Sequence, residues 1–393
     1  MTGQDRMNPL LQMLEYGQSY WLDNLTRGML ADGTLARRVA EDGLRGVTSN
    51  PAIFRAAITD GEEYDAEIER MAEEDSTALE IYEQLTQTDV RDACDVLRPV
   101  YDASGGTDGF VSLEVSPHLA RDAGQTLDEA RRLFADVDRP NLMIKIPGTP
   151  EGVPAIEEAV FEGINVNVTL LFGIAEYEAA AEAYQRALER RVAAGRSADD
   201  VASVASFFLS RIDALADGLI EGIAAASPDP DRAAAARALS GLAAIANAKL
   251  AYESFEQRMA GDRWVALERA GARAQRLLWA STSTKNPAYS DVKYVEPLIG
   301  EHTVNTLPES TIAAFRDHGR VADTIRDGVE DAQSTLDALA GLGLDFGEIT
   351  DQLLEEGIDK FVVPFDELIE TLAERRATVT GRVAAALAPG GDG

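Results

Sequence analysis

The feature that most constrains the fold is the alternation of short strand-like runs with longer amphipathic stretches along most of the chain. This alternation predicts repeated strand-then-helix units and a parallel sheet. Eight strand-like runs favour a closed (β/α)8 TIM barrel, although periodicity alone also permits a doubly wound sheet. The predicted strands are Tyr20–Leu25, Gly46–Asn50, Gly109–Val115, Leu142–Pro147, Asn165–Phe172, Val201–Phe208, Arg276–Thr282 and His302–Leu307.

The connections between these strands predict helices outside the barrel. Glu176–Ala193 has the residue types and the 3.6-residue spacing of an amphipathic helix. The connections Pro51–Asp108 and Ser210–Ala274 are too long for one helix each, and we predict helical insertions there. The prediction is therefore a single domain over residues 1–393, with the barrel at about residues 19–325.

A helical C-terminal extension is predicted at about residues 326–387. The segment Glu309–Val383 has a helical pattern throughout, except for the short apolar run Phe361–Pro364. The extension could cover the barrel mouth, support a dimer or pack on the outer shell, and the pattern does not choose among these. The tail Ala388–Gly393 is rich in Pro and Gly and is predicted to fray.

The charge of the chain excludes several classes of partner. Lys and Arg number 36 against 68 Asp and Glu, a formal net charge of −32, on a background that is 45% hydrophobic. That hydrophobic content argues against disorder, and the negative charge argues against nucleic acid and anionic membrane surfaces as partners. Met1–Leu14 lacks the basic and apolar regions of a signal peptide, and no segment has the ~20 apolar residues of a membrane span, so a cytoplasmic protein is expected.

Cysteine and histidine chemistry is poorly represented. The only cysteine, Cys94, excludes an internal disulfide and a zinc cluster, and is predicted to be a buried structural thiol. The three histidines, His118, His302 and His318, are scattered and predicted to have surface or packing roles. No metal site is therefore expected.

Side-chain alternation within the predicted strands places polar groups inside the barrel. In Leu142–Pro147 the three apolar alternate positions share one face, so Lys145 points inward. The same argument directs polar side chains of other strands inward near their carboxyl ends, where barrel enzymes carry their catalytic groups. The inward positions of two further strands are Phe110, Ser112 and Glu114 in the one and Asn165, Asn167 and Thr169 in the other, and Asp23 and Asn50 share the parity of Trp21 and Thr48.

The convergence of Asp23, Glu114 and Lys145 has two interpretations. A buried ion-pair network would satisfy the charges without any function. Lysine is, however, a less suitable partner than arginine for a buried ion pair, whereas it can lose its proton and act as a nucleophile. Three titratable groups at one barrel end favour a Schiff-base site.

Five motifs, taken in order, resemble those of the transaldolases, a family of (β/α)8 enzymes of the pentose phosphate pathway. The resemblance runs from about Tyr20 to Thr311. The motifs are Gly46-Val47-Thr48-Ser49-Asn50-Pro51, Val111-Ser112-Leu113-Glu114-Val115, Ile144-Lys145-Ile146-Pro147-Gly148-Thr149-Pro150-Glu151-Gly152, Asn165-Val166-Asn167-Val168-Thr169-Leu170-Leu171-Phe172, and Ser206-Phe207-Phe208 with Arg211-Ile212.

The resemblance implies a role for each inward residue. Lys145 would form a Schiff base with a ketose donor, Glu114 would act as general acid and base through a water held by Thr169, and Asp23 would take the donor hydroxyl proton. Asn50 and Asn167 would hold sugar hydroxyls and the imine, and Ser206 would line the donor pocket. The family implies no metal and no organic cofactor. The implied reaction moves a dihydroxyacetone unit from sedoheptulose 7-phosphate to glyceraldehyde 3-phosphate.

The phosphate end of the substrate departs from the family pattern. Arg211 and Ser281 match phosphate contacts, but Ser283 stands where an arginine is expected, and Lys285 is the substitute we predict. The run Trp279–Pro287 resembles a longer bacterial branch of the family. Alternatively, Lys285 is a solvated loop charge. The expected partners are phosphorylated sugars, and the protein would be a monomer or a homodimer.

Two other functions remain open. A related fructose-6-phosphate aldolase would release the three-carbon fragment; that branch generally has tyrosine where this chain has Glu114, which favours transfer. A catalytically silent sugar-phosphate-binding barrel would keep Lys145 and Glu114 as a structural pair.

Overall fold

The computed structural model describes residues 7–387, and it contains one closed barrel of eight parallel strands in chain order. The predicted barrel is thus confirmed, and the doubly wound alternative is excluded. The strands are β1 (Gln18–Leu22), β2 (Gly46–Val47), β3 (Phe110–Glu114), β4 (Leu142–Pro147), β5 (Val166–Leu171), β6 (Ser203–Phe208), β7 (Arg276–Ala280) and β8 (Thr303–Leu307).

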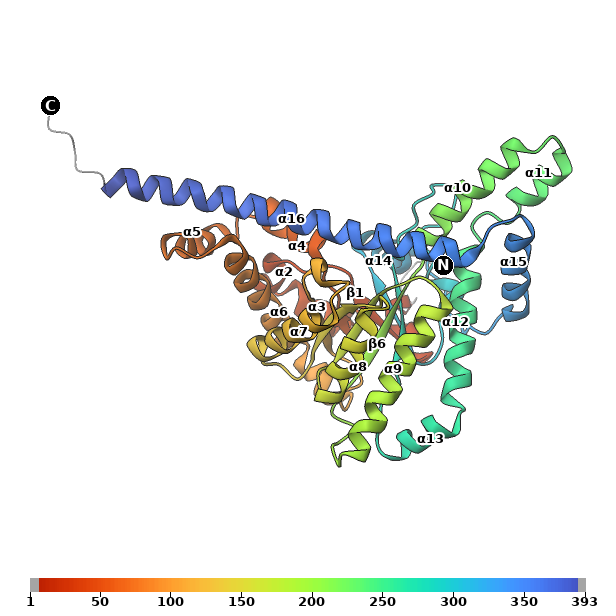
Figure 1. Cartoon of the computed structure of the whole chain (residues 1–393), viewed down its shortest axis with the longest axis horizontal. Helices are drawn as coiled ribbons and strands as arrows, with labels where there is room; N and C mark the ends of the chain where they lie inside the picture. The colour runs from red at the N-terminus through yellow and green to blue at the C-terminus, as the bar shows by residue number, and fades with distance from the viewer. Residues whose placement is uncertain (1–6, 388–393) are drawn as a thin grey trace.

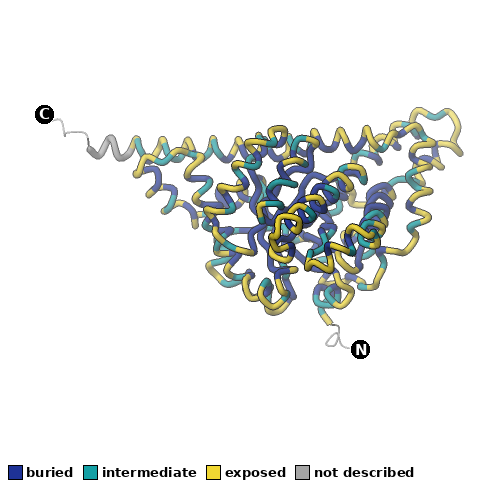
Figure 2. The backbone as a smooth tube through the Cα atoms, turned by 60° about the horizontal axis from the view of Figure 1, so that its bottom comes forward, coloured by how far each residue is buried: buried dark blue, intermediate teal, exposed yellow. Residues whose placement is uncertain are grey.

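Helices surround the barrel, and buried residues are concentrated in its centre (Figures 1 and 2). Both long connections contain several helices, as predicted. The helices are α1 (Pro9–Glu15), α2 (Arg27–Ala31), α3 (Thr34–Glu41), α4 (Pro51–Asp60), α5 (Asp65–Glu73), α6 (Ala78–Ala103), η1 (Pro117–Leu119), α7 (Ala123–Val137), α8 (Gly152–Glu162), α9 (Ile174–Ala193), α10 (Ser210–Ala226), α11 (Pro230–Arg237), α12 (Ala243–Met259), α13 (Asp262–Arg269), η2 (Glu296–Leu298), α14 (Glu309–His318), α15 (Val329–Gly341) and α16 (Phe346–Leu387).

Strand register brings the predicted inward residues to one face. Glu114 of β3 pairs with Lys145 of β4, and Lys145 pairs with Asn167 of β5. Paired residues on neighbouring parallel strands point to the same side of the sheet. The predicted inward orientation of these three side chains is therefore mutually consistent around the barrel.

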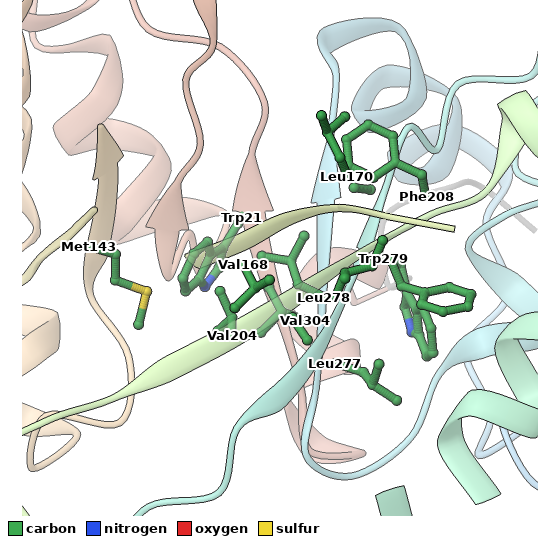
Figure 3. Close-up of a cluster of buried hydrophobic side chains, with 14 of the residues drawn as sticks. Trp21, Met143, Val168, Leu170, Val204, Phe208, Leu277, Leu278, Trp279 and Val304 are labelled. Carbon is green, nitrogen blue, oxygen red and sulfur yellow. The ribbon is translucent and has the colours of Figure 1, made fainter. Parts of the chain in front are cut away.

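A layer of buried apolar side chains lies inside the barrel, below the carboxyl ends of the strands. Trp21, Met143, Val204 and Val304 are all at most 1% exposed, and Figure 3 draws them among the strands. Gly46 makes room for the indole, because a Cβ at this position would lie 2.4 Å from Trp21 ring atoms. The predicted site residues lie above this layer, toward the carboxyl ends of the strands.

Two strands, β1 and β2, end three residues earlier than predicted, and β3, β5 and β7 end one or two residues earlier. β1 ends at Leu22, so Asp23 lies just beyond the strand, although its N–H still donates to the Leu307 carbonyl (2.9 Å). β2 ends at Val47, because Asn50 is the N-cap of α4 and its Oδ1 accepts from the Ile53 N–H (3.0 Å). Capping, rather than strand pairing, fixes the position of Asn50.

The segment Glu309–Val383 differs from the predicted continuous helical pattern, because it forms three helices, α14, α15 and α16, with breaks after His318 and after Gly341. Phe361–Pro364 lies inside the continuous helix α16, so the expected interruption there is wrong. The apolar run was misleading because only one side of it faces the protein: Phe361 is 5% exposed and Val363 is 54% exposed. Figure 1 shows α16 running along one side of the whole molecule. The predicted fraying tail, 388–393, lies outside the described residues.

The remaining sequence expectations concern single residues. Cys94 is completely buried within α6, as predicted. His118 and His318 are exposed and pair with Asp366 and Asp291. Among the described helices, none is long and apolar enough to cross a membrane.

Candidate active site

A cavity of about 190 Å³ lies at the carboxyl ends of the strands. Seven of the ten predicted site residues line it: Asp23, Asn50, Lys145, Ser206, Arg211, Ser281 and Lys285. The other three, Glu114, Asn167 and Thr169, are buried beside these residues instead of lining the cavity. The barrel thus gathers groups from both halves of the sequence into one site.

Lys145 is the central cation of the cavity. It is 5% exposed, and its Nζ donates to the backbone carbonyl of Ser49 (3.1 Å). The Glu114 carboxylate lies 3.8 Å from the same nitrogen, and the centre of the Phe361 ring lies 5.4 Å from it. A primary amine held in a buried pocket beside a carboxylate is suited to nucleophilic attack on a carbonyl carbon.

Glu114 is 8% exposed, and neither of its carboxylate oxygens has a hydrogen-bond partner among the described residues. Burial raises the pKa of Glu114 to about 7, and the Lys145 charge opposes this shift. A carboxyl group with a pKa near neutrality can both give and take a proton during turnover. The environment therefore suits the group to acid–base catalysis.

Asp23 is held by a short chain of hydroxyl groups. The Thr48 hydroxyl donates to Asp23 Oδ1 (2.8 Å), and Thr48 and Thr306 share a hydrogen bond of 2.7 Å. Burial raises the pKa of the Asp23 carboxyl, whereas the Lys145 charge lowers it. These contacts orient the carboxylate on the wall of the cavity.

A second chain of hydrogen bonds crosses the barrel beneath the cavity. The Ser206 hydroxyl donates to Asn167 Oδ1 (2.6 Å), and Asn167 Nδ2 donates to Ser112 Oγ (3.0 Å). Asn167 is completely buried and paired in register with Lys145. The Thr169 hydroxyl is buried and has no hydrogen-bond partner among the described residues.

One end of the cavity is basic. Arg211 lies in the first turn of α10, where the helix dipole adds positive potential, and its buried Nη1 has no hydrogen-bond partner in the described part of the chain. Lys285 is partly exposed at the edge of the cavity, and its Nζ donates to Ser283 Oγ (2.6 Å). Burial and the Arg211 charge lower the pKa of Lys285. Two neighbouring cations of this kind favour an anionic ligand.

Sequence reasoning missed several residues that line the cavity. Thr306 and Phe208 face inward, and their strand alternation could have revealed them. Phe361 could not be predicted in this way. It lies on a helix far along the chain, and it reaches the site only because of the path that α16 takes across the barrel.

A larger cavity, of about 450 Å³, lies at the opposite end of the barrel. Its lining includes Phe110, Met143 and Trp264, and none of the ten predicted site residues. A choice of site by cavity volume would therefore miss the cluster of Asp23, Glu114 and Lys145. No group of three or more His, Cys, Asp and Glu side chains among residues 7–387 could hold a metal ion.

The chain is similar to known proteins along most of its length. The family model for transaldolase/fructose-6-phosphate aldolase matches residues 20–372, extending past the predicted limit at Thr311 into α16. A transaldolase of Trichodesmium erythraeum is 48% identical over 95% of this chain and 99% of the relative. A transaldolase of Thermobifida fusca is 45% identical over 95% of this chain and 100% of the relative.

Proposed function

This chain belongs to the transaldolase/fructose-6-phosphate aldolase family, and we propose that it works as a transaldolase with Lys145 as its Schiff-base nucleophile. The reaction transfers a dihydroxyacetone unit from sedoheptulose 7-phosphate to glyceraldehyde 3-phosphate, giving erythrose 4-phosphate and fructose 6-phosphate. The observation that carries the proposal is the buried Lys145 ammonium group 3.8 Å from Glu114 on a cavity with a basic end.

The first half of the reaction forms the imine. Neutral Lys145 Nζ adds to the ketose carbonyl carbon, and the carbinolamine then loses water. Glu114 accepts and returns the protons, and we assign Thr169, whose hydroxyl is otherwise unpaired, to hold the water that relays them. The resulting iminium carries a positive charge beside the bond to be broken.

Cleavage follows when Asp23 removes the proton from the C4 hydroxyl of the donor. The C3–C4 electron pair moves toward the iminium nitrogen, the aldehyde leaves, and an enamine of dihydroxyacetone stays on Lys145. The acceptor aldehyde then reacts in the reverse direction, Asp23 returns its proton, and water releases the new ketose. The iminium acts as the electron sink in both directions.

Substrate binding divides the cavity in two. We assign the hydroxyls of the three-carbon unit to Asn50, Asn167 and Ser206. Asn50 Oδ1 already accepts the capping hydrogen bond from the Ile53 N–H, so Asn50 would bind the sugar by donating from Nδ2. We assign the phosphate to the basic end formed by Arg211, Ser281 and Lys285. This arrangement sets the carbonyl carbon between the two ends, near Lys145.

The family also contains fructose-6-phosphate aldolases, which release the fragment. Transfer is favoured here because the curated relatives are transaldolases at 45–49% identity and because a glutamate stands at position 114.

Borohydride trapping tests the proposal. The protein is incubated with fructose 6-phosphate, reduced with borohydride and mapped by peptide mass spectrometry. A three-carbon adduct on Lys145, together with transfer to erythrose 4-phosphate, is expected. Lys145→Arg keeps the charge and serves as the matched control, which should give neither adduct nor turnover. Folded wild-type protein with no adduct on Lys145 would contradict the proposal.

A further inference from the structure

Phe361 is the one side chain of α16 on the lining of the catalytic cavity among the described residues. Its ring is 5% exposed, and its centre lies 5.4 Å from Lys145 Nζ. This distance is within the range of a cation–π contact. The ring therefore covers the nitrogen atom on which the covalent intermediate would form.

The helix that carries Phe361 is fixed on both sides of it. Glu355 pairs with Arg121, and Asp366 pairs with His118 (2.7 Å). Gly357 allows close approach to β5, since a Cβ at this position would lie 3.0 Å from Leu170 Cδ2. Phe361 is thus held over the mouth by contacts outside the cavity.

The covalent intermediate has two fates that differ in what reacts with the enamine carbon. In transfer, the enamine carbon bonds to the carbon of a sugar aldehyde, and water then hydrolyses the iminium and releases the new ketose. In release, the enamine carbon takes a proton instead, water adds to the resulting iminium carbon, and the carbon–nitrogen bond breaks to give free dihydroxyacetone and the Lys145 amine. Anything that keeps water from delivering a proton to the enamine carbon before the aldehyde adds therefore favours transfer.

We infer that Phe361 is a specificity-determining residue: its ring keeps water away from the enamine carbon of the Lys145-bound three-carbon unit, so that this carbon bonds to a sugar aldehyde and not to a proton. The inference rests on the proposed function and adds to it the residue that separates transfer from release. The aromatic face also favours a cationic nitrogen more than a neutral one.

The test compares four proteins: the wild type, Phe361→Ala, Phe361→Leu and Leu368→Ala. Leu368 is completely buried on the same helix but does not line the catalytic cavity, so its truncation controls for weakened packing of α16. Each protein receives fructose 6-phosphate with and without erythrose 4-phosphate. The ratio of free dihydroxyacetone to transferred product is measured by mass spectrometry, and the Lys145 adduct is trapped with borohydride in parallel.

We expect Phe361→Ala to raise the ratio of release to transfer by about tenfold, Phe361→Leu to raise it less, and Leu368→Ala to leave it unchanged. An unchanged ratio in Phe361→Ala, or an equal rise in Leu368→Ala, would overturn the inference about Phe361. If the wild-type adduct on Lys145 is still trapped in that case, the proposed function is not affected. A wild-type protein without the adduct would overturn both. If Phe361→Ala does not fold, Phe361→Leu decides by the same criterion.

Discussion

The Glu114 carboxylate lies 3.8 Å from the Lys145 ammonium nitrogen, and the two residues are register partners on β3 and β4. Both are nearly inaccessible to water: the side chain alone is 5% exposed for Glu114 and 6% exposed for Lys145. A buried pair with no further hydrogen bonds to its carboxylate is an inefficient way to stabilise a fold. The pair is instead well suited to exchanging protons with a substrate.

The pH dependence of activity should reflect Glu114. Burial raises its pKa to about 7, so protonation at lower pH removes the base that accepts a proton from Lys145 or a carbinolamine. We expect kcat/KM to fall below pH 7 with an apparent pKa near 7. Glu114→Gln should lower kcat by about 10²- to 10⁴-fold and remove that inflection. An inflection that persists in Glu114→Gln would assign it to another group.

Asp23→Asn should separate imine formation from carbon–carbon cleavage. The amide keeps the shape of the carboxylate and its contact with Thr48 but cannot take the C4 hydroxyl proton. Borohydride reduction with fructose 6-phosphate should therefore trap an intact six-carbon adduct on Lys145, where the wild type gives a three-carbon adduct. A three-carbon adduct in Asp23→Asn would exclude Asp23 as the base.

Removal of the Lys285 ammonium group should weaken phosphate binding. Since a hydrogen bond to a charged group contributes about 1.5–3 kcal/mol, we expect Lys285→Ala to raise KM for fructose 6-phosphate at least tenfold. KM for unphosphorylated fructose should not change. Lys360→Ala is the matched control, because Lys360 pairs with Glu356 on the surface of α16. An unchanged KM for fructose 6-phosphate would contradict this assignment and indicate that Lys285 is a solvated loop charge.

Asp213 should be essential for stability. It is 1% exposed and receives hydrogen bonds from the Ala244 N–H (2.8 Å) and the Tyr294 hydroxyl (2.9 Å), with Lys293 Nζ at 3.1 Å. Asp213→Ala would leave these donors unpaired and should cost about 3–5 kcal/mol of unfolding free energy in urea titrations. Glu221→Ala, which breaks the exposed pair with Arg237, should have little effect. Similar losses in both variants would contradict this assignment.

The sequence by itself determined the order of strands and helices and the direction of the inner side chains, whereas the closure of the sheet into a barrel was confirmed by the structure. Strand alternation has a period of two, so the apolar faces of β3, β4 and β5 leave only one orientation for Glu114, Lys145 and Asn167. Motif order then indicated the chemistry. The orientation of these side chains could be predicted because it depends on neighbours within a few residues of the same strand.

Only the tertiary structure decided what closes the site and which groups touch. The capping role of Asn50 depends on where β2 gives way to α4, and the Thr48–Thr306 contact joins opposite ends of the chain. Phe361 reaches Lys145 because α16 packs across the barrel mouth, whereas local pattern suggested a break in that helix. Such contacts arise from the packing of distant elements, and local periodicity carries no information about that packing.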